Sequence, residues 1–259
     1  MNTWALGVSY DGTPFHGWQL QNHVPTVQGE LEQALGKIAD EPVRVHAAGR
    51  TDRGVHATSQ VVGFRTNQDR SSETWLRGLN GLTAESVRVQ WVRAVDSDFH
   101  ARYSAVARRY HYVYIDDDRY ADPLFRDRAW HCRALDADTM HRDAQALVGE
   151  QDFTSFRAAG CQSTTPMRRV NGCLVTRSGR FVVMEIQANA FLLHMVRNIA
   201  SALHDVGRDA GARSIADVLA AKDRSRLGIT APAEGLYFTD VAYNGYEFPQ
   251  GRLPVFLGL

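Results

Sequence analysis

Both halves of this 259-residue chain combine strand-like and helix-like segments, and that mixture limits the folds it can adopt. Alternating patterns rich in aromatic and β-branched residues predict strands near 4–10, 43–48, 60–65, 86–95, 109–115, 168–177, 180–188 and 236–243. Apolar residues that recur every three or four positions predict helices at 26–39, 72–80, 136–148, 191–206 and 214–221. We therefore expect an α+β fold in which each half has its own strands and helices.

The segment 191–206 has the clearest helical pattern in the chain. Its apolar stripe comprises Leu192, Val196, Ile199, Leu203 and Val206. Arg197 interrupts this apolar segment, and Gly207 is a typical residue to end it. A partly buried arginine is costly without an acidic partner, so we expect a carboxylate close to Arg197. From these residues alone, a purely structural ion pair is as good an interpretation as a functional one.

The composition is ordinary for a globular protein, with 44% hydrophobic and 22% charged residues. The apolar runs are too short to span a bilayer, and the first residues show no export signal, so we expect a cytoplasmic protein. Cys132, Cys161 and Cys173 form no CxxC pair, which argues against a disulfide framework or a cysteine-rich zinc site. No HExxH or P-loop pattern occurs.

The basic residues are unevenly distributed although the formal net charge is zero. Residues 44–109 carry 11 arginines against 6 acidic residues, and residues 157–213 carry 8 against 3. Residues 110–156 reverse the balance, with 5 arginines against 10 acidic residues. If the two basic segments converge, they form a phosphate-binding surface on a neutral protein. Most basic residues are arginine rather than lysine. A GC-rich genome, which favours arginine codons, explains this preference as well as phosphate binding does.

A glycine-bounded loop, residues 47–57, holds one carboxylate between two arginines. Asp52 lies between Arg50 and Arg53, and the loop connects two predicted strands. Neighbouring arginines favour the ionised carboxylate, which then can act as a nucleophile or a base. A surface turn with a structural Arg–Asp pair is the simpler interpretation of these residue types.

Tyr110 lies in the predicted strand 109–115, where Tyr110 and Tyr112 face one side and His111 the other. An aromatic pair in a core explains this pattern as well as a tyrosine that stacks on a nucleobase and carries a proton.

Several ordered motifs resemble those of the TruA family of tRNA pseudouridine synthases. The clearest is the segment 49–57, Gly-Arg-Thr-Asp-Arg-Gly-Val-His-Ala, in which the family usually has alanine at the place of Arg53. Similar blocks occur at 10–19, 26–32, 99–105, 109–112, 152–156, 160–163, 190–199 and 233–237. The resemblance extends from about residue 4 to residue 244.

The resemblance implies a pseudouridine synthase fold of two similar subdomains, with a largely antiparallel sheet and a central active-site cleft. Residues 1–102 would form the N-terminal subdomain with the aspartate loop, and residues 103–259 the C-terminal subdomain with the tyrosine strand and the arginine helix. It also implies a homodimer that isomerises uridine to pseudouridine at nucleotides 38, 39 and 40 of the tRNA anticodon arm. The family uses no cofactor and no metal.

The resemblance further assigns roles to four residues. Asp52 would be the nucleophile on a flipped-out uridine, Arg50 would support that nucleotide, and Tyr110 would contact the base. Arg197 would pair with Asp52. Whether Asp52 attacks C6 of the base or C1′ of the sugar, or removes a sugar proton, is left open by the sequence. Two rival functions are a nucleoside hydrolase and an RNA-binding module without catalytic activity.

Overall fold

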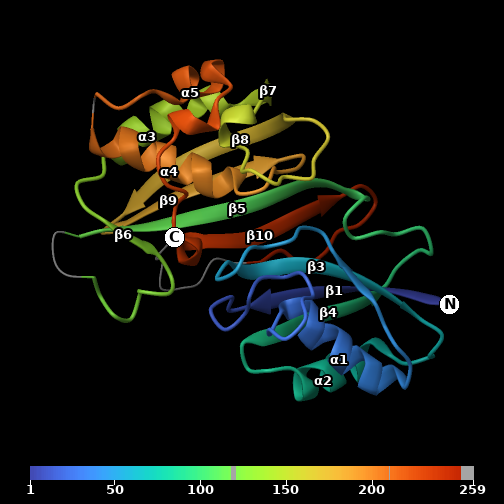
Figure 1. Cartoon of the computed structure of the whole chain (residues 1–259). Coiled ribbons are helices and arrows are strands. Elements are labelled where there is room, and N and C mark those ends of the chain that lie inside the picture. Colours follow the sequence, from blue (N-terminus) through green and yellow to red (C-terminus); the bar gives the residue numbers. More distant parts are fainter. Residues whose placement is uncertain (118–120, 210, 252–259) are drawn as a thin grey trace. The chain divides into compact units, whose positions relative to one another are not determined.

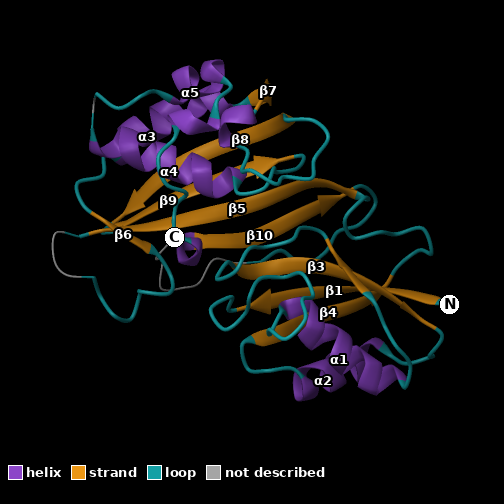
Figure 2. Cartoon of the chain, viewed as in Figure 1, coloured by secondary structure: helices purple, strands orange, loops and turns teal. Residues whose placement is uncertain are grey.

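The computed structural model describes residues 1–117, 121–209 and 211–251, and it divides the chain into two compact units. The first unit comprises Met1–Arg108 and the segment that begins at Tyr237, and the second comprises Arg109–Leu236. Figure 1 colours the chain along its sequence, and Figure 2 distinguishes its helices from its strands. Each unit has its own strands, helices and core, so each is described by itself.

The strands of the first unit lie in the order β4-β1-β3-β10, and a short strand, β2, also pairs with β3. Their bounds are β1 (Asn2–Tyr10), β2 (Val45–Ala47), β3 (His56–Thr66), β4 (Val87–Ala94) and β10 (Leu236–Tyr243). β1 pairs antiparallel with β3 and β4, and β2 pairs antiparallel with β3. β10 runs parallel to β3, with Tyr237 opposite His56. The first unit is therefore completed by a strand from the far end of the sequence.

Two helices, α1 (Val27–Ala39) and α2 (Ser72–Leu82), lie next to each other on one side of these strands (Figures 1 and 2). The Thr26 hydroxyl accepts a hydrogen bond from the Gly29 amide and so caps α1. Trp75 of α2 is fully buried, with its ring 6.4 Å from that of Trp4 and 5.2 Å from that of Phe64. This aromatic cluster joins α2 to β1 and β3 and forms the centre of the first core.

The main strands of the second unit lie in the order β5-β9-β8-β7. They are β5 (Ala105–Asp116), β7 (Gly149–Asp152), β8 (Met167–Ser178) and β9 (Phe181–Ala188), and β6 (Trp130–Cys132) pairs in parallel with β5. β8 pairs antiparallel with β7 and β9. The helices are α3 (Ala137–Ala144), α4 (Met195–Arg208) and α5 (Ile215–Ala221), and α3 packs on β8 and α4. Short 3-10 turns occur at η1 (Gln145–Leu147), η2 (Thr154–Phe156), η3 (Arg224–Arg226) and η4 (Ala233–Gly235).

The predicted α+β class is confirmed, and most predicted elements are present. Two predicted helices are shorter than expected. The helix expected at 191–206 begins only at Met195, because His194 has a φ of 59° and starts it from a left-handed conformation. Leu192 is buried, but it precedes this helix and is not part of its apolar stripe. The helix expected at 136–148 ends at Ala144 and continues as the 3-10 turn η1.

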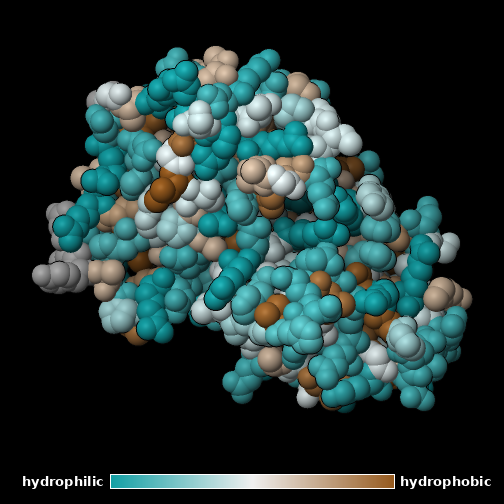
Figure 3. All heavy atoms as spheres, in the orientation of Figure 1, coloured by the Kyte–Doolittle hydropathy of each residue, from teal (hydrophilic) through white to brown (hydrophobic). Residues whose placement is uncertain are grey.

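Hydrophilic residues cover most of the face seen in Figure 3, and hydrophobic residues appear there in scattered spots. Phe15, Trp18 and Trp75 are among the apolar side chains inside the core, at 4%, 2% and 0% exposed. Across the part of the chain that the structure describes, no helix has the length and apolar character needed to cross a membrane.

Candidate active site

The loop that carries Asp52 leaves β2 and enters β3, and the segment after β1 holds it in place. The Tyr10 hydroxyl lies 2.8 Å from the Thr51 hydroxyl, and the Trp18 amide donates to the Thr51 carbonyl at 2.9 Å. At the start of the loop, the Gln60 side chain donates to the Gly49 carbonyl at 2.6 Å. The residue directly before Asp52 is thus fixed through both its side chain and its carbonyl.

Two glycines of this holding segment allow its backbone to touch the loop directly. A Cβ atom on Gly12 would lie 2.0 Å from the Val55 carbonyl oxygen, which no side chain tolerates. Gly17 has a φ of +95°, and its Cβ atom would lie 2.9 Å from the Thr51 carbonyl oxygen. The close approach of these two backbones therefore requires glycine at both positions. We call residues 10–18 the loop clamp.

Burial keeps the clamp tyrosine neutral. Tyr10 is 4% exposed, and burial raises its pKa to about 12, although its hydrogen bonds to Thr51 and Gln60 act in the opposite direction. A hydroxyl that stays protonated and bonded to Thr51 is a fixed structural tie.

The loop presents its charged side chains outward. Asp52 is half-buried, whereas Arg50 and Arg53 are exposed. The Asp52 carbonyl accepts a hydrogen bond from the Val55 amide at 3.2 Å, and Gly54 takes a φ of +79° within this turn. Gly54 suits this turn, because a φ of this sign favours glycine. The turn therefore places the half-buried Asp52 on a tightly held backbone.

His56, at the end of the loop, is buried and structurally bonded. Its Nδ1 atom accepts a hydrogen bond from the Gly12 amide at 3.1 Å and lies 3.2 Å from a carboxylate oxygen of Asp11. Its ring stacks on that of Tyr237, with centroids 4.9 Å apart and planes 25° apart. His56 therefore joins the loop, the clamp and β10.

In the second unit, Tyr110 lies on β5 and is 7% exposed. Its ring meets that of Phe191 edge-on, with centroids 5.1 Å apart and planes 86° apart. The predicted alternation along the strand is present, since the His111 ring bonds instead to a carboxylate oxygen of Glu185 at 2.9 Å. Nearby, the Tyr112 hydroxyl donates to the Pro232 carbonyl at 2.8 Å. Phe191 had not been singled out from the sequence, although it lies in a block that carries the family resemblance.

Arg197 lies in the first turn of α4 and is half-buried. Its Nε atom donates to the Ala231 carbonyl at 2.7 Å, and the Ala231 amide donates back to the Arg197 carbonyl at 3.4 Å. Burial raises the pKa of Tyr112 well above its usual value, Glu234 raises it further, and the positive charge of Arg197 lowers it. The guanidinium group is therefore anchored at one end by a backbone carbonyl and lies near Tyr112.

The four predicted site residues thus fall into two pairs. Asp52 and Arg50 share one loop of the first unit, and Tyr110 and Arg197 belong to the second. In the residues that the structure describes, no three His, Cys, Asp or Glu side chains are grouped closely enough to hold a metal ion. The clamp residues Tyr10, Gly12 and Gly17 were missed as a functional group, although they lie in a block that resembles the family.

Comparison with known proteins places the chain among the pseudouridine synthases. A family model described as "tRNA pseudouridine synthase" matches residues 7–104 and 144–244, which include Arg50, Asp52 and Arg197 but not Tyr110. A chain in the "Crystal Structure of a Cbf5-Nop10-Gar1 Complex" aligns with a TM-score of 0.36 and 14% identity, over 78% of this chain and 45% of that one, and the family assignment does not rest on it.

Curated relatives match over nearly the whole sequence. The proteins named "tRNA pseudouridine synthase A" from Shewanella sp. (strain MR-4) and Shigella boydii serotype 4 (strain Sb227) are each 49% identical to this chain. The first match covers 98% of both chains, and the second covers 98% of this chain and 95% of the relative. The chain therefore belongs to the tRNA pseudouridine synthase family, and it is an isomerase that acts on tRNA.

Proposed function

We propose that this enzyme isomerises uridine to pseudouridine at nucleotides 38, 39 and 40 of the tRNA anticodon stem-loop, with Asp52 as the nucleophile. The observation that carries the proposal is the held loop. Asp52 is half-buried on a turn whose backbone is bonded to Tyr10 and Trp18 through Thr51. A fixed backbone with an accessible carboxylate is suited to attack on a substrate that enters from solvent.

The reaction exchanges one bond to the sugar for another. The N1–C1′ bond of uridine breaks, a C5–C1′ bond forms, the hydrogen on C5 is released as a proton, and N1 gains a proton. No electrons are transferred to an outside acceptor, so the balance needs no redox partner. A base in a paired stem must leave the stack before a protein carboxylate reaches it, so the target uridine is flipped out. Attack at C6, attack at C1′ and removal of a sugar proton remain three alternative first steps.

The other predicted residues have complementary roles in this proposal. Arg50 is exposed two residues before Asp52 and supports the flipped nucleotide. Tyr110 contacts the uracil, with its ring braced by the edge of Phe191. Arg197, whose Nε atom bonds to the Ala231 carbonyl, pairs with Asp52 through its guanidinium group. We also propose that the enzyme acts as a cytoplasmic homodimer and that its arginine-rich segments bind the tRNA phosphates.

Nucleoside chromatography of treated tRNA tests the proposal and separates its rivals. Unmodified tRNA incubated with the enzyme should lose uridine at positions 38 to 40 and gain an equal amount of pseudouridine. A nucleoside hydrolase would release free uracil, and a binding module without catalytic activity would leave the tRNA unchanged. Either of those results would contradict the proposed reaction. Conversion of uridines confined to another arm of the tRNA would contradict the proposed site.

A further inference from the structure

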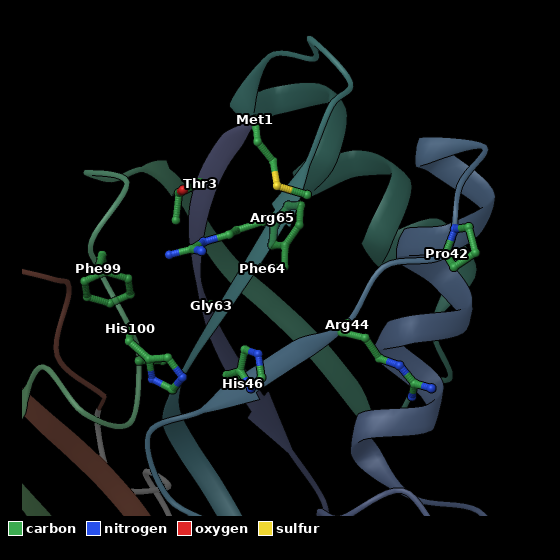
Figure 4. Close-up of a pocket in the computed structure, with 11 residues that line it drawn as sticks. Met1, Thr3, Pro42, Arg44, His46, Gly63, Phe64, Arg65, Phe99 and His100 are labelled. Carbon is green, nitrogen blue, oxygen red and sulfur yellow. The ribbon is translucent and has the colours of Figure 1, made fainter.

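A cavity of about 310 Å³ lies in the first unit beside β2 and β3. Figure 4 shows Arg44 and His46 from the chain around β2, Arg65 from β3, and Phe99 and His100 from a later loop around it. Among the described residues that line the cavity, none carries a carboxylate. The cavity therefore combines aromatic walls with cationic side chains, and the proposed reaction uses none of these residues.

Three neighbouring rings, tilted by 33° and 36° from one to the next, lie in a row between this cavity and the exposed Tyr103. The His46 and His100 ring centroids are 4.8 Å apart, and the two rings lie side by side in Figure 4. The His100 and Tyr103 centroids are 4.4 Å apart, and the Arg102 guanidinium carbon lies 5.6 Å from the centre of the Tyr103 ring. Tyr103 is 76% exposed, which is unusual for so large an aromatic side chain. We call His46, His100 and Tyr103 the aromatic stack.

The loop that carries the stack is held in one conformation. The His100 Nδ1 atom accepts hydrogen bonds from the amides of Arg102 and Tyr103, at 3.1 and 3.3 Å. The His100 amide donates to the Ser104 hydroxyl at 3.0 Å. A ring fixed in this way presents a stacking surface with little entropy left to lose on binding.

The charges around the stack favour an anionic ligand. Burial lowers the pKa of His100, and the positive charges of His46, Arg65 and Arg102 lower it further. Arg65 donates to the Ser97 carbonyl at 2.6 Å, so its charge is not neutralised by that contact. Arg44 forms an ion pair with Glu32 at 2.9 Å, which offsets part of the positive charge at one side. Arg65 and Arg102 are the cationic groups on which the anionic ligand depends.

The stack is also tied to the start of the Asp52 loop. Arg108, which is 9% exposed, donates to the Ala48 carbonyl at 3.2 Å and to the Arg102 carbonyl at 2.5 Å. Ala48 precedes Asp52 by four residues, so their Cα atoms are at most about 14 Å apart. An RNA strand engaged at the stack would therefore lie within a few nucleotides of the Asp52 loop.

We propose that the aromatic stack, with Arg44, Arg65 and Arg102, is a subsite that binds an unpaired nucleotide of tRNA together with its phosphate. The inference rests on the proposed function only in taking tRNA as the ligand. Stacking on aromatic rings and contact with arginines are the means by which proteins bind unstacked nucleotides without reading a base sequence. The subsite contributes affinity and orientation and takes no part in bond breaking.

The test measures the affinity of the full-length protein for fluorescently labelled, unmodified tRNA. Tyr103→Ala and His46→Ala should each raise the Kd about fivefold or more, whereas Tyr103→Phe, which keeps the ring, should stay within twofold of wild type. Arg65→Ala should reduce the slope of log Kd against log salt by about one. Arg126→Ala is the matched control, because this arginine lies in the acidic segment 110–156, is 75% exposed and pairs with Asp127. It should leave both quantities unchanged.

Turnover at saturating tRNA should stay within twofold of wild type in all these variants, because the subsite acts on binding alone. Unchanged tRNA affinity in both Tyr103→Ala and His46→Ala would overturn the subsite. Unchanged affinity with an altered sedimentation coefficient would also overturn it and assign the stack to contact with a second copy of the chain. A different result would contradict the proposed reaction and leave the subsite intact: wild-type protein that binds tRNA but forms no pseudouridine.

Discussion

The Asp52 loop and the Tyr110–Arg197 region are held by different means. Backbone contacts fix the loop, because the clamp approaches it so closely that Gly12 and Gly17 leave no room for a Cβ atom. Packing and single side-chain bonds fix the second region, where Tyr110 meets the edge of Phe191 and Arg197 bonds to the Ala231 carbonyl. The loop should therefore tolerate almost no change of shape, whereas the second region should respond to changes in chemical groups.

After substitution of Asp52, substitution of Arg197 should reduce turnover the most. Arg197→Leu keeps much of the aliphatic packing and removes the guanidinium group, so turnover should fall about 100-fold or more if this group holds Asp52. Affinity for tRNA should change far less. Single-turnover kinetics at saturating enzyme would check this, and a turnover within threefold of wild type would make Arg197 a purely structural residue.

Gly12→Ala should be the most destabilising substitution in the clamp. The added Cβ atom would meet the Val55 carbonyl at 2.0 Å, so the backbone must shift, at a cost of about 2–3 kcal/mol in the free energy of unfolding. Turnover should fall with it. Gly81→Ala is the control, since nothing lies within 4 Å of its Cβ position and alanine favours a helix. The stability of both variants is measured by urea denaturation. Equal free energies of unfolding for Gly12→Ala and Gly81→Ala would contradict the account.

The pair Tyr110→Phe and Tyr112→Phe separates chemistry from packing in the second region. Tyr110→Phe should lower turnover about tenfold and leave stability nearly unchanged, because it keeps the ring on Phe191. Tyr112→Phe should instead lower stability by about 1 kcal/mol, because it removes the bond to the Pro232 carbonyl, and should leave turnover unchanged. The opposite pattern in the two assays would show that the functional tyrosine has been misassigned.

The smallest expected effect concerns the pKa of Tyr10 at alkaline pH. This pKa is raised to about 12 in the folded chain, so the unfolded chain loses the proton first, near pH 10. The resulting stabilisation is present below pH 10 and is lost between about pH 10 and 12, which adds a downward slope of stability with pH. Tyr10→Phe should reduce that slope in denaturation measured from pH 9 to 12. An identical slope in the variant would contradict the burial argument.

Local features were predictable from the sequence, and contacts between distant segments were not. The helix α1 and its Thr26 cap follow from apolar spacing and one hydroxyl, both of which act within a few residues. The parallel pairing of β10 with β3 joins residues 181 positions apart, and nothing in either strand specifies its partner. The start of α4 was misjudged because His194 adopts a left-handed conformation that periodicity does not reveal.

The candidate site shows the same division. The Asp52 loop was found because its charges and glycines lie together in the sequence. The clamp was missed because the hydroxyl of Tyr10 meets that of Thr51 only in the folded chain. The aromatic stack was missed for the same reason, since His46 and Tyr103 are isolated residues until the fold brings them to either side of His100.

Release of tritium from uridine C5 measures the central claim most directly, because the hydrogen on C5 leaves only when the new C5–C1′ bond forms. Wild-type protein should release the label from tRNA tritiated at C5. Asp52→Asn keeps the size of the side chain but is a very poor nucleophile and base, so it should release none while binding tRNA as well as wild type. Appreciable release of label by a folded Asp52→Asn protein would contradict the assignment of Asp52 and the mechanism built on it.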